Sequence, residues 1–367
     1  MKVNTIGLNS VRLNTIALNH IGEIRSGGGD SKPSPIPQWI REHIVFYYDV
    51  KKQGATNETL KESAYLQDLS GKGRRMKLNN FLFDMMSGVD GYKNESFVNV
   101  SDAIDIRFDY INGRQIKGKP TQNWDKFGYY RANNMVKRII YCNWHVEGIL
   151  DDNKVYVAQY TVYDNRVELH NGDNYIELDT NQGNAGYNYI SVISDQPYST
   201  DITITQIPEY PGALVTDGVD DYGLVENLSS GVKMLFMTVN PIGDNVGKTY
   251  YAQSNMSRPF WVYVNINSIA YNSINPSGVT YIDGMLNKSI YCQELFNVKH
   301  TITIVNGTVD STNTVQPVFF ANEHYGYGYF SKLAFYNSIA FDSIPTEADG
   351  FTEQELIDYV LTNIIGQ

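Results

Sequence analysis

Residues 137–146 read KRIIYCNWHV and residues 154–163 read KVYVAQYTVY, and runs of this kind decide the fold class. Both runs are short and rich in Val, Ile and Tyr, which is typical of β-strands. The same features recur in AIDIRFDYI (103–111), NYIELDT (174–180), YNYISVIS (187–194) and DITITQI (201–207). Residues 96–209 therefore predict a small β-sandwich of roughly a hundred residues.

The rest of the chain also reads as strands joined by turns. HIVFYYDV (43–50) indicates a buried strand, and six further runs between residues 212 and 342 have a similar composition. A helix is predicted only at the end, where TEQE (352–355) forms a capping box before an apolar stripe. The stripe consists of Leu356, Ile357, Val360, Leu361 and Ile364. We expect an all-β protein with a short C-terminal helix.

Composition narrows the classes of function. The net charge is -11 and the isoelectric point is about 5.0, so nucleic-acid binding, which requires clustered Lys and Arg, is not expected. No apolar run is long enough to cross a bilayer, and no signal peptide is expected. Cys142 and Cys292 match no metal or redox spacing. Two free buried thiols are favoured over one long-range disulfide.

A five-residue repeat occupies residues 4–24, NTIGLNSVRLNTIALNHIGEI. A period of five fits neither a helical stripe nor one face of a flat strand. Four repeats are also too few to bury their own apolar side chains as a solenoid. We therefore expect residues 1–25 to be an oligomerisation and anchoring stem that packs against other chains; the alternative is a tail with accidental regularity. The candidate contact residues are Ile6, Leu8, Val11, Leu13, Ile16, Leu18 and Ile21.

The segment RSGGGDSKPSPIPQ (25–38) follows the repeat. Gly makes such a segment flexible and Pro makes it extended, so residues 26–39 are interpreted as a linker. The linker would let the globular part swing relative to an anchored stem.

Three stretches together resemble the concanavalin-like, laminin-G-type jelly rolls: DLSGKGRRMKLNNF (68–81), GALVTDGVDDYGLVENL (212–228) and FSKLAFYNSIAFDSIPTEADGFTEQELIDYVLTNII (330–365). In that family the first two of these stretches lie close together in the sequence. Here they are far apart, because Phe83, just after the first, and Ala213, in the second, are about 130 positions apart. The resemblance implies a jelly roll formed by residues 40–95 plus 210–367, with the 96–209 β-sandwich inserted. The alternative is two consecutive sandwiches.

The repeat also resembles the start of virion proteins from crAss-like and other gut-bacterial phages, in which similar repeats precede a Gly-rich joint and laminin-G-like heads. This resemblance implies a head or tail fibre, or a related decorating protein, that is assembled in the host cytoplasm and located in the virion. The stem would bind a capsid or tail protein. A homotrimer is favoured because fibres with short interwound stems are usually threefold.

An enzymatic function is not expected. Laminarinase-type glycosidases share the jelly roll but carry an ExDxxE strand, which pairs a nucleophile with an acid. That string does not occur here, and neither does GxSxG, HExxH or a P-loop. The alternatives to a virion protein are a bacterial surface glycan-binding adhesin and a concanavalin-fold glycosidase.

Two loops supply candidate sites. NEHYGYGYF (322–330) offers aromatic rings and polar groups for a host-surface glycan, although the alternation also fits a buried sheet face. Its candidate residues are Asn322, His324, Tyr325, Tyr327 and Tyr329. In DGVDDYG (217–223), Asp217 and Asp220 are candidate calcium ligands. We favour instead the interpretation that this stretch is the tip of a tight hairpin, with Asp and Gly as turn formers and no cofactor.

Asp68, in the DLSGKG turn, is likewise interpreted as a turn former. Residues 210–367 hold six basic and fifteen acidic residues, which favours neutral glycans or proteins as partners.

Overall fold

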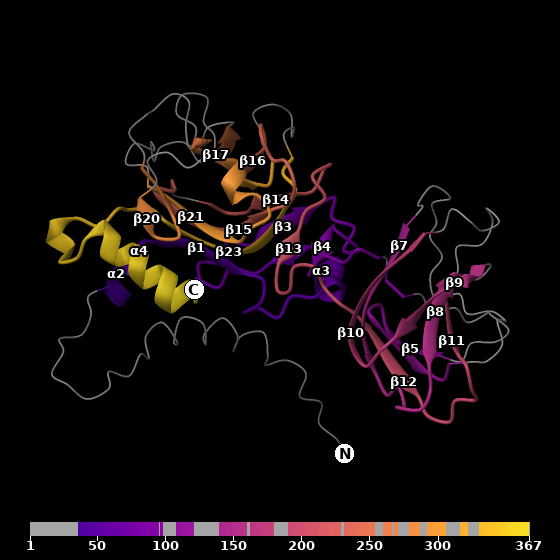
Figure 1. The fold of residues 1–367 in the computed structure, drawn as a ribbon. Coiled ribbons are helices and arrows are strands. Elements are labelled where there is room, and N and C mark those ends of the chain that lie inside the picture. The colour runs from indigo at the N-terminus through magenta and orange to yellow at the C-terminus, as the bar shows by residue number, and fades with distance from the viewer. Residues whose placement is uncertain are drawn as a thin grey trace, which may run out of the picture. The chain divides into compact units, whose positions relative to one another are not determined.

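The computed structural model describes most of the chain from Ile36 onward (Figure 1). The described ranges are 36–94, 96–97, 108–120, 139–159, 162–179, 190–228, 231–253, 260–265, 268–270, 279–286, 292–305, 316–321 and 330–366. They are mostly strands in antiparallel sheets, with a few short helices, which confirms the all-β fold.

The chain divides into two compact units. The first unit comprises Met1–Phe83, Ser87–Asp90 and Gly212–Gln367, and the second comprises Asp84–Met86 and Gly91–Pro211. The second unit therefore occupies the middle of the sequence, and both flanking segments belong to the first. The sequence analysis placed the inserted domain at residues 96–209.

The first unit contains two antiparallel sheets within the described residues. One has eight strands: β1 (Ile44–Asp49), β4 (Gly88–Val89), β13 (Leu214–Val215), β15 (Met234–Pro241), β19 (Val279–Ile282), β20 (Met285–Leu286), β21 (His300–Val305) and β23 (Leu333–Phe341). The other has seven: β2 (Tyr65–Leu66), β3 (Met76–Asn79), β14 (Tyr222–Val225), β16 (Thr249–Gln253), β17 (Phe260–Asn265), β18 (Ser268–Ala270) and β22 (Val318–Phe319).

An aromatic cluster joins these two sheets. Phe319 on the seven-stranded sheet lies within 5.7–6.1 Å, centroid to centroid, of Phe46, Tyr48 and Phe335 on the eight-stranded sheet. All four side chains are fully buried, and edge-to-face ring contacts of this kind add to the free energy gained by burial. The two sheets thus pack face to face as a β-sandwich.

Helices cover the other face of the eight-stranded sheet (Figure 1). Phe46 and Tyr48 of β1 face the second sheet, and Tyr47 between them packs against the helices, because successive side chains of a strand point to opposite faces. Ile44 also packs against the helices, since the register of β1 shifts between Ile44 and Phe46. These are α2 (Ile36–His43), α4 (Glu353–Tyr359) and the π-helical turn η5 (Val360–Ile365) that continues α4. Coverage on both faces explains why every residue of β1 is buried.

The C-terminal helix confirms its prediction in detail. Thr352 Oγ1 accepts a hydrogen bond from the Glu355 N–H at 3.2 Å, and the Glu355 carboxylate accepts one from the Thr352 N–H at 2.7 Å. This is the expected capping box. All five residues of the predicted apolar stripe are buried.

Two α-helices of the described residues were not predicted. Residues 36–39, assigned to the linker, belong to α2, where Pro37 is tolerated in the first turn and Trp39 and Ile40 are buried. The second is α3 (Asn57–Ser63), which begins with a capping box between Thr56 and Thr59.

The second unit is a smaller sandwich within the described residues. Its five-stranded sheet runs in the order β10 (Gly172–Asp179), β7 (Ile139–Glu147), β12 (Ile202–Gln206), β6 (Gln115–Gly118) and β5 (Phe108–Asn112). A three-stranded sheet holds β11 (Ile190–Ser194), β8 (Val155–Gln159) and β9 (Val162–Leu169). The shared core includes Cys142, a free buried thiol, as expected.

Two stretches differ from the sequence expectations. KVYVAQYTVY is not one strand, because β8 and β9 form an antiparallel hairpin in which Gln159 pairs with Val162. GVDDY is not the tip of a tight hairpin, because β13 pairs with β4 and β23 in one sheet while β14 pairs with β3 and β22 in the other. The stretch is a crossover between the two sheets.

No helix within the described ranges has both the length and the apolar character needed to cross a membrane.

Candidate functional site

Most of the residues predicted as sites lie outside the described residues. This applies to the repeat residues Ile6 to Ile21 and to the glycan candidates Asn322, His324, Tyr325, Tyr327 and Tyr329. Their roles stay predictions. Asp217 and Asp220 are described, and they lie beside a third carboxylate, Asp221.

The three carboxylates are held by a hydrogen-bonded crossover. The Asp217 N–H donates to Asp221 Oδ2 at 2.9 Å, and Ser87 Oγ donates to Asp221 Oδ1 at 3.1 Å. The Val219 N–H donates to Asp217 Oδ1 at 2.7 Å. Asp221 is fully buried, whereas Asp220 is exposed. Both oxygens of Asp221 therefore already have partners in the protein.

Burial raises the pKa of Asp221 to about 7, and the charges of Asp217 and Asp220 act in the same direction. The hydrogen bonds from the Asp217 N–H and from Ser87 oppose the rise in pKa. The three carboxylates each offer a ligand atom within 4.8 Å of the others, which is compatible with a cation. The hydrogen bonds within the crossover also hold these carboxylates without a cation, so calcium binding stays the less favoured alternative.

Asp68 is a structural anchor rather than a simple turn former. It is buried, and Oδ1 accepts hydrogen bonds from the N–H groups of Tyr47 and Ser70 at 3.0 and 2.9 Å. Oδ2 accepts a third bond from the Arg74 N–H at 3.0 Å. The carboxylate thus fastens the Gly-rich turn to β1.

The surface best suited to recognition, within the described residues, is the outer face of the five-stranded sheet in the second unit. The register aligns Asp173, His145, Thr205 and Gln115 across four neighbouring strands. Since side chains alternate along each strand, these four project away from the buried core. Tyr175 is two residues further along β10 on the same face, and its side chain is 66% exposed.

Hydrogen bonds hold this row in place at both ends. His145 Nδ1 lies 2.6 Å from Asp173 Oδ1, and Gln115 Nε2 donates to Thr205 Oγ1 at 3.0 Å. The hydrogen bond to Asp173 raises the pKa of His145, and the charges of Asp173 and Glu147 act in the same direction. We call Tyr175, Asp173, His145, Thr205 and Gln115 the sheet-face cluster. It places one exposed ring beside a band of donors and acceptors.

This cluster was not predicted from the sequence, although one signal was present. In GDNYIELD the side chains Asn174, Ile176 and Leu178 are buried, and alternation then places Tyr175 on the outer face. What the sequence does not contain is the register, which brings four strands from distant positions into one row.

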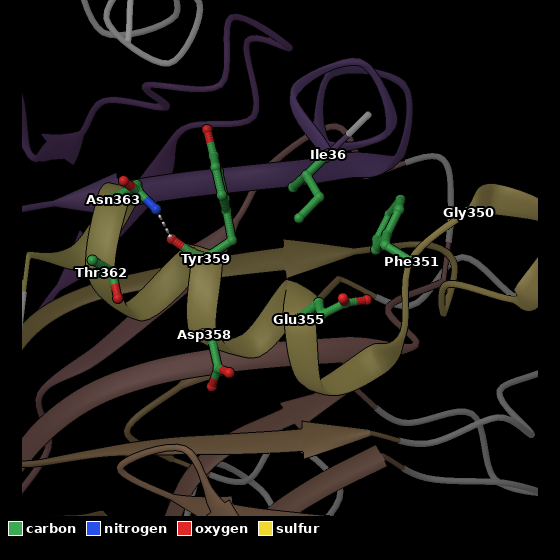
Figure 2. A pocket seen from close by; sticks show the side chains of 8 residues that line it. All are labelled: Ile36, Gly350, Phe351, Glu355, Asp358, Tyr359, Thr362 and Asn363. Atoms are coloured by element: carbon green, nitrogen blue, oxygen red, sulfur yellow. Dashed lines mark hydrogen bonds between the residues drawn. The ribbon is translucent and has the colours of Figure 1, made fainter. Parts of the chain in front are cut away.

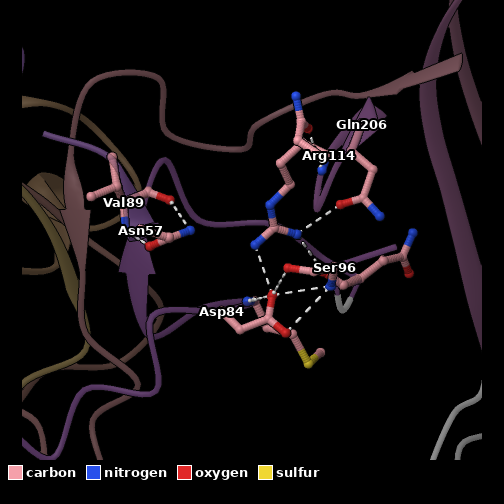
Figure 3. A network of polar contacts seen from close by, with 9 residues as sticks. Asn57, Asp84, Val89, Ser96, Arg114 and Gln206 are labelled. Atoms are coloured by element: carbon pink, nitrogen blue, oxygen red, sulfur yellow. Dashed lines mark hydrogen bonds and ion pairs between the residues drawn. The ribbon is translucent and has the colours of Figure 1, made fainter. Parts of the chain in front are cut away.

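A second polar network ties the start of the second unit to its sheet (Figure 3). Asp84 Oδ1 accepts hydrogen bonds from Arg114 Nη2 at 2.7 Å and from Ser96 Oγ at 2.9 Å. Arg114 Nη1 donates to Gln206 Oε1 at 2.8 Å, and its guanidinium lies 3.8 Å from the centre of the Tyr92 ring. The polar groups of this network are paired with one another, so we assign it a structural role.

Comparisons of the chain with protein-family models, with curated proteins and with solved structures found no match.

Proposed function

We propose that this chain is a non-enzymatic structural protein of a bacteriophage virion, a head or tail fibre or a related decorating protein. Its N-terminal repeat anchors it and joins it to other copies, with a trimer favoured. Its two β-units are presented outward for adhesion to host-surface glycans. The observation that carries the proposal is the five-residue repeat, which is followed by a Gly- and Pro-rich joint and then by an all-β fold.

The anchoring role rests on the chemistry of the repeat. Seven aliphatic residues recur in four units, and so few units cannot bury their own apolar side chains. The chain after the joint is fixed to the first unit: Trp39 of α2 packs against Phe341 at 5.5 Å and against Phe351 at 5.6 Å between ring centroids. A pull on the joint would therefore be transmitted to the first unit.

The adhesive role rests on the sheet-face cluster. A sugar ring presents C–H groups on one face and hydroxyl groups around its edge. An exposed tyrosine ring can stack against the first, and carboxylate, imidazole, hydroxyl and amide groups can hydrogen-bond to the second. Tyr175 supplies the ring, and the row from Asp173 to Gln115 supplies the polar groups.

Binding to an array of host-surface glycans, followed by adsorption to host cells, tests the adhesive role. Tyr175→Ala should lower the affinity at least tenfold while leaving the thermal unfolding midpoint nearly unchanged, because the ring is exposed. Tyr110→Ala is the matched control, since Tyr110 is a 39%-exposed tyrosine of the same unit whose paired residue, Ile116, faces the core.

Equal binding by wild type and Tyr175→Ala would show that the sheet-face cluster is not the adhesive site. A wild-type protein that binds no glycan and no host cell would overturn the adhesive role itself.

A further inference from the structure

A groove of about 440 Å³ lies between the start of α2 and the C-terminal helix in the first unit (Figure 2). Figure 2 shows Ile36 of α2 near Phe351 and Tyr359, with Glu355, Asp358 and Thr362 on the helix that forms the other wall. Ile36 is also the first residue that the structure describes. The chain that precedes it must therefore leave from the wall of this groove.

The floor of the groove is apolar and its rim is acidic. Ile36 and Phe351 are largely buried, while the carboxylates of Glu355 and Asp358 lie on exposed residues. The hydrogen bonds that the Thr352 N–H and hydroxyl donate to Glu355 lower the pKa of that carboxyl, so it is ionised near neutral pH. Among the described residues, no Lys or Arg lines the groove.

The segment before Ile36 has the complementary chemistry. Residues 1–35 hold Lys2, Arg12, Arg25 and Lys32 against Glu23 and Asp30, and they carry the seven aliphatic side chains of the repeat. In the stretch SVRLN, Arg12 stands between Val11 and Leu13, so one short piece offers two apolar side chains and one cation. Such a piece matches an apolar floor with an acidic rim.

The length of the joint permits this contact within one chain. Residues 25–35 separate the repeat from Ile36, and eleven residues can span at most about 36–40 Å. A short flexible link also gives the tethered segment an effective concentration of the order of millimolar, so a weak contact is enough to keep the groove occupied.

We propose that the groove binds the N-terminal repeat of its own chain. The inference rests on the proposed function, in which the repeat is the assembly element, and adds a storage site for it. In the free subunit the groove covers aliphatic side chains that would otherwise promote premature association. During assembly, contacts with other chains compete for the repeat and release it.

Photo-crosslinking of the full-length chain, at a dilution at which light scattering reports single subunits, tests this inference. A benzophenone amino acid replaces Thr362, an exposed residue that lines the groove, and the cross-linked peptides are identified by mass spectrometry. We expect links to residues 4–24 in a product that keeps the mass of one chain on a denaturing gel. The control carries the same probe at Glu58, an exposed residue of α3 in the same unit.

A charge reversal sharpens the test. Asp358→Lys should lower the yield of these links about two- to fivefold, as expected for the loss of an exposed charge interaction, with an unchanged circular dichroism spectrum. Links that avoid residues 4–24, or that form only in a product of twice the mass, would overturn the inference. The anchoring role is tested separately, because oligomer mass after deletion of residues 1–25 does not depend on where the free repeat is stored.

Discussion

Ser87 Oγ donates a 3.1 Å hydrogen bond to Oδ1 of Asp221, a residue 134 positions later in the sequence. Both side chains are buried, and the bond joins Ser87–Asp90 to Gly212–Gln367, two of the three sequence segments that form the first unit. Asp221 lies on the crossover between the two sheets, so its ionisation bears directly on the stability of that unit.

Asp221→Asn should therefore change how stability depends on pH. Burial raises the pKa of this carboxyl from its usual 3.8 to about 7 in the folded state. The folded state then holds the proton more tightly than the unfolded state, so this group makes the free energy of unfolding fall as pH rises from about 4 to 7. A pKa shift of that size can lower the free energy of unfolding by at most about 4 kcal/mol over this pH range.

Urea unfolding at pH 5 and pH 8 measures this effect. The variant should lose less free energy of unfolding than the wild type between the two pH values. Glu58→Gln, at an exposed position, is the control and should retain the wild-type pH dependence. Parallel curves for wild type and Asp221→Asn would contradict the raised pKa.

Gly88→Ala should destabilise the first unit strongly. Gly88 has a φ of +154°, and a Cβ there would collide with Asn57 Oδ1 and would lie 2.9 Å from Cα of Phe83, a backbone atom that cannot simply move aside. Its neighbour Val89 is fixed by Asn57, whose Oδ1 accepts from the Val89 N–H at 2.7 Å (Figure 3). We expect a loss of about 3 kcal/mol or more, or an insoluble product.

Gly54→Ala provides the matched comparison for thermal unfolding. Gly54 also has a positive φ, +61°, but a Cβ there would meet nothing within 4 Å. Only the backbone cost of about 1 kcal/mol is then expected. Similar unfolding midpoints for the two variants would show that the close approach of Gly88 to Asn57 and Phe83 does not contribute to stability.

Arg114→Ala should destabilise the second unit by about 2–4 kcal/mol, because it removes the cationic partner of Asp84 and one partner of Gln206 together. Hydrogen exchange of the β6 and β12 amides measures this unit specifically. Lys154→Ala removes an exposed ion pair with Glu168 at 3.5 Å and should cost less than about 1 kcal/mol. Equal exchange rates in both variants would argue against a structural role for Arg114.

Asp173→Asn should lower the pKa of His145. In the wild type the hydrogen bond to Asp173 raises that pKa above 6.5, so the imidazolium persists to higher pH and loses its proton as pH rises through the raised value. An NMR titration of the imidazole carbon-bound protons reports the midpoint. Glu168→Gln, on β9, should leave it unchanged. A midpoint unaffected by Asp173→Asn would show that the pair does not persist in solution.

The predictable parts of the fold are those encoded by short-range pattern. The capping box at Thr352 and the apolar stripe that follows it predicted a helix, and the structure has one. HIVFYYDV predicted a buried strand, and β1 is buried at every position. Both features can be predicted from neighbouring residues, because a helix cap and a fully buried strand each depend on the residue types within one short segment.

The errors arise where long-range partners decide the structure. GVDDY has the residues of a tight turn, but the strands on either side pair with β4 and β3 in different sheets, so it crosses between layers. Residues 36–39 of α2 were assigned to the linker because of the Gly and Pro content of residues 25–38, although the burial of Trp39 against Phe341 and Phe351 makes the helix favourable. The sheet-face cluster depends on register among four strands, which no single segment encodes.

Light scattering of the full chain and of a form lacking residues 1–25 tests the central claim most directly. The full chain should form an oligomer, with three copies favoured, because the repeat cannot bury its own aliphatic side chains. The shortened chain should have the mass of one subunit with an unchanged circular dichroism spectrum, since residues 36–366 contain both folded units. A shortened chain that keeps the full oligomeric mass would contradict the assembly role of the repeat.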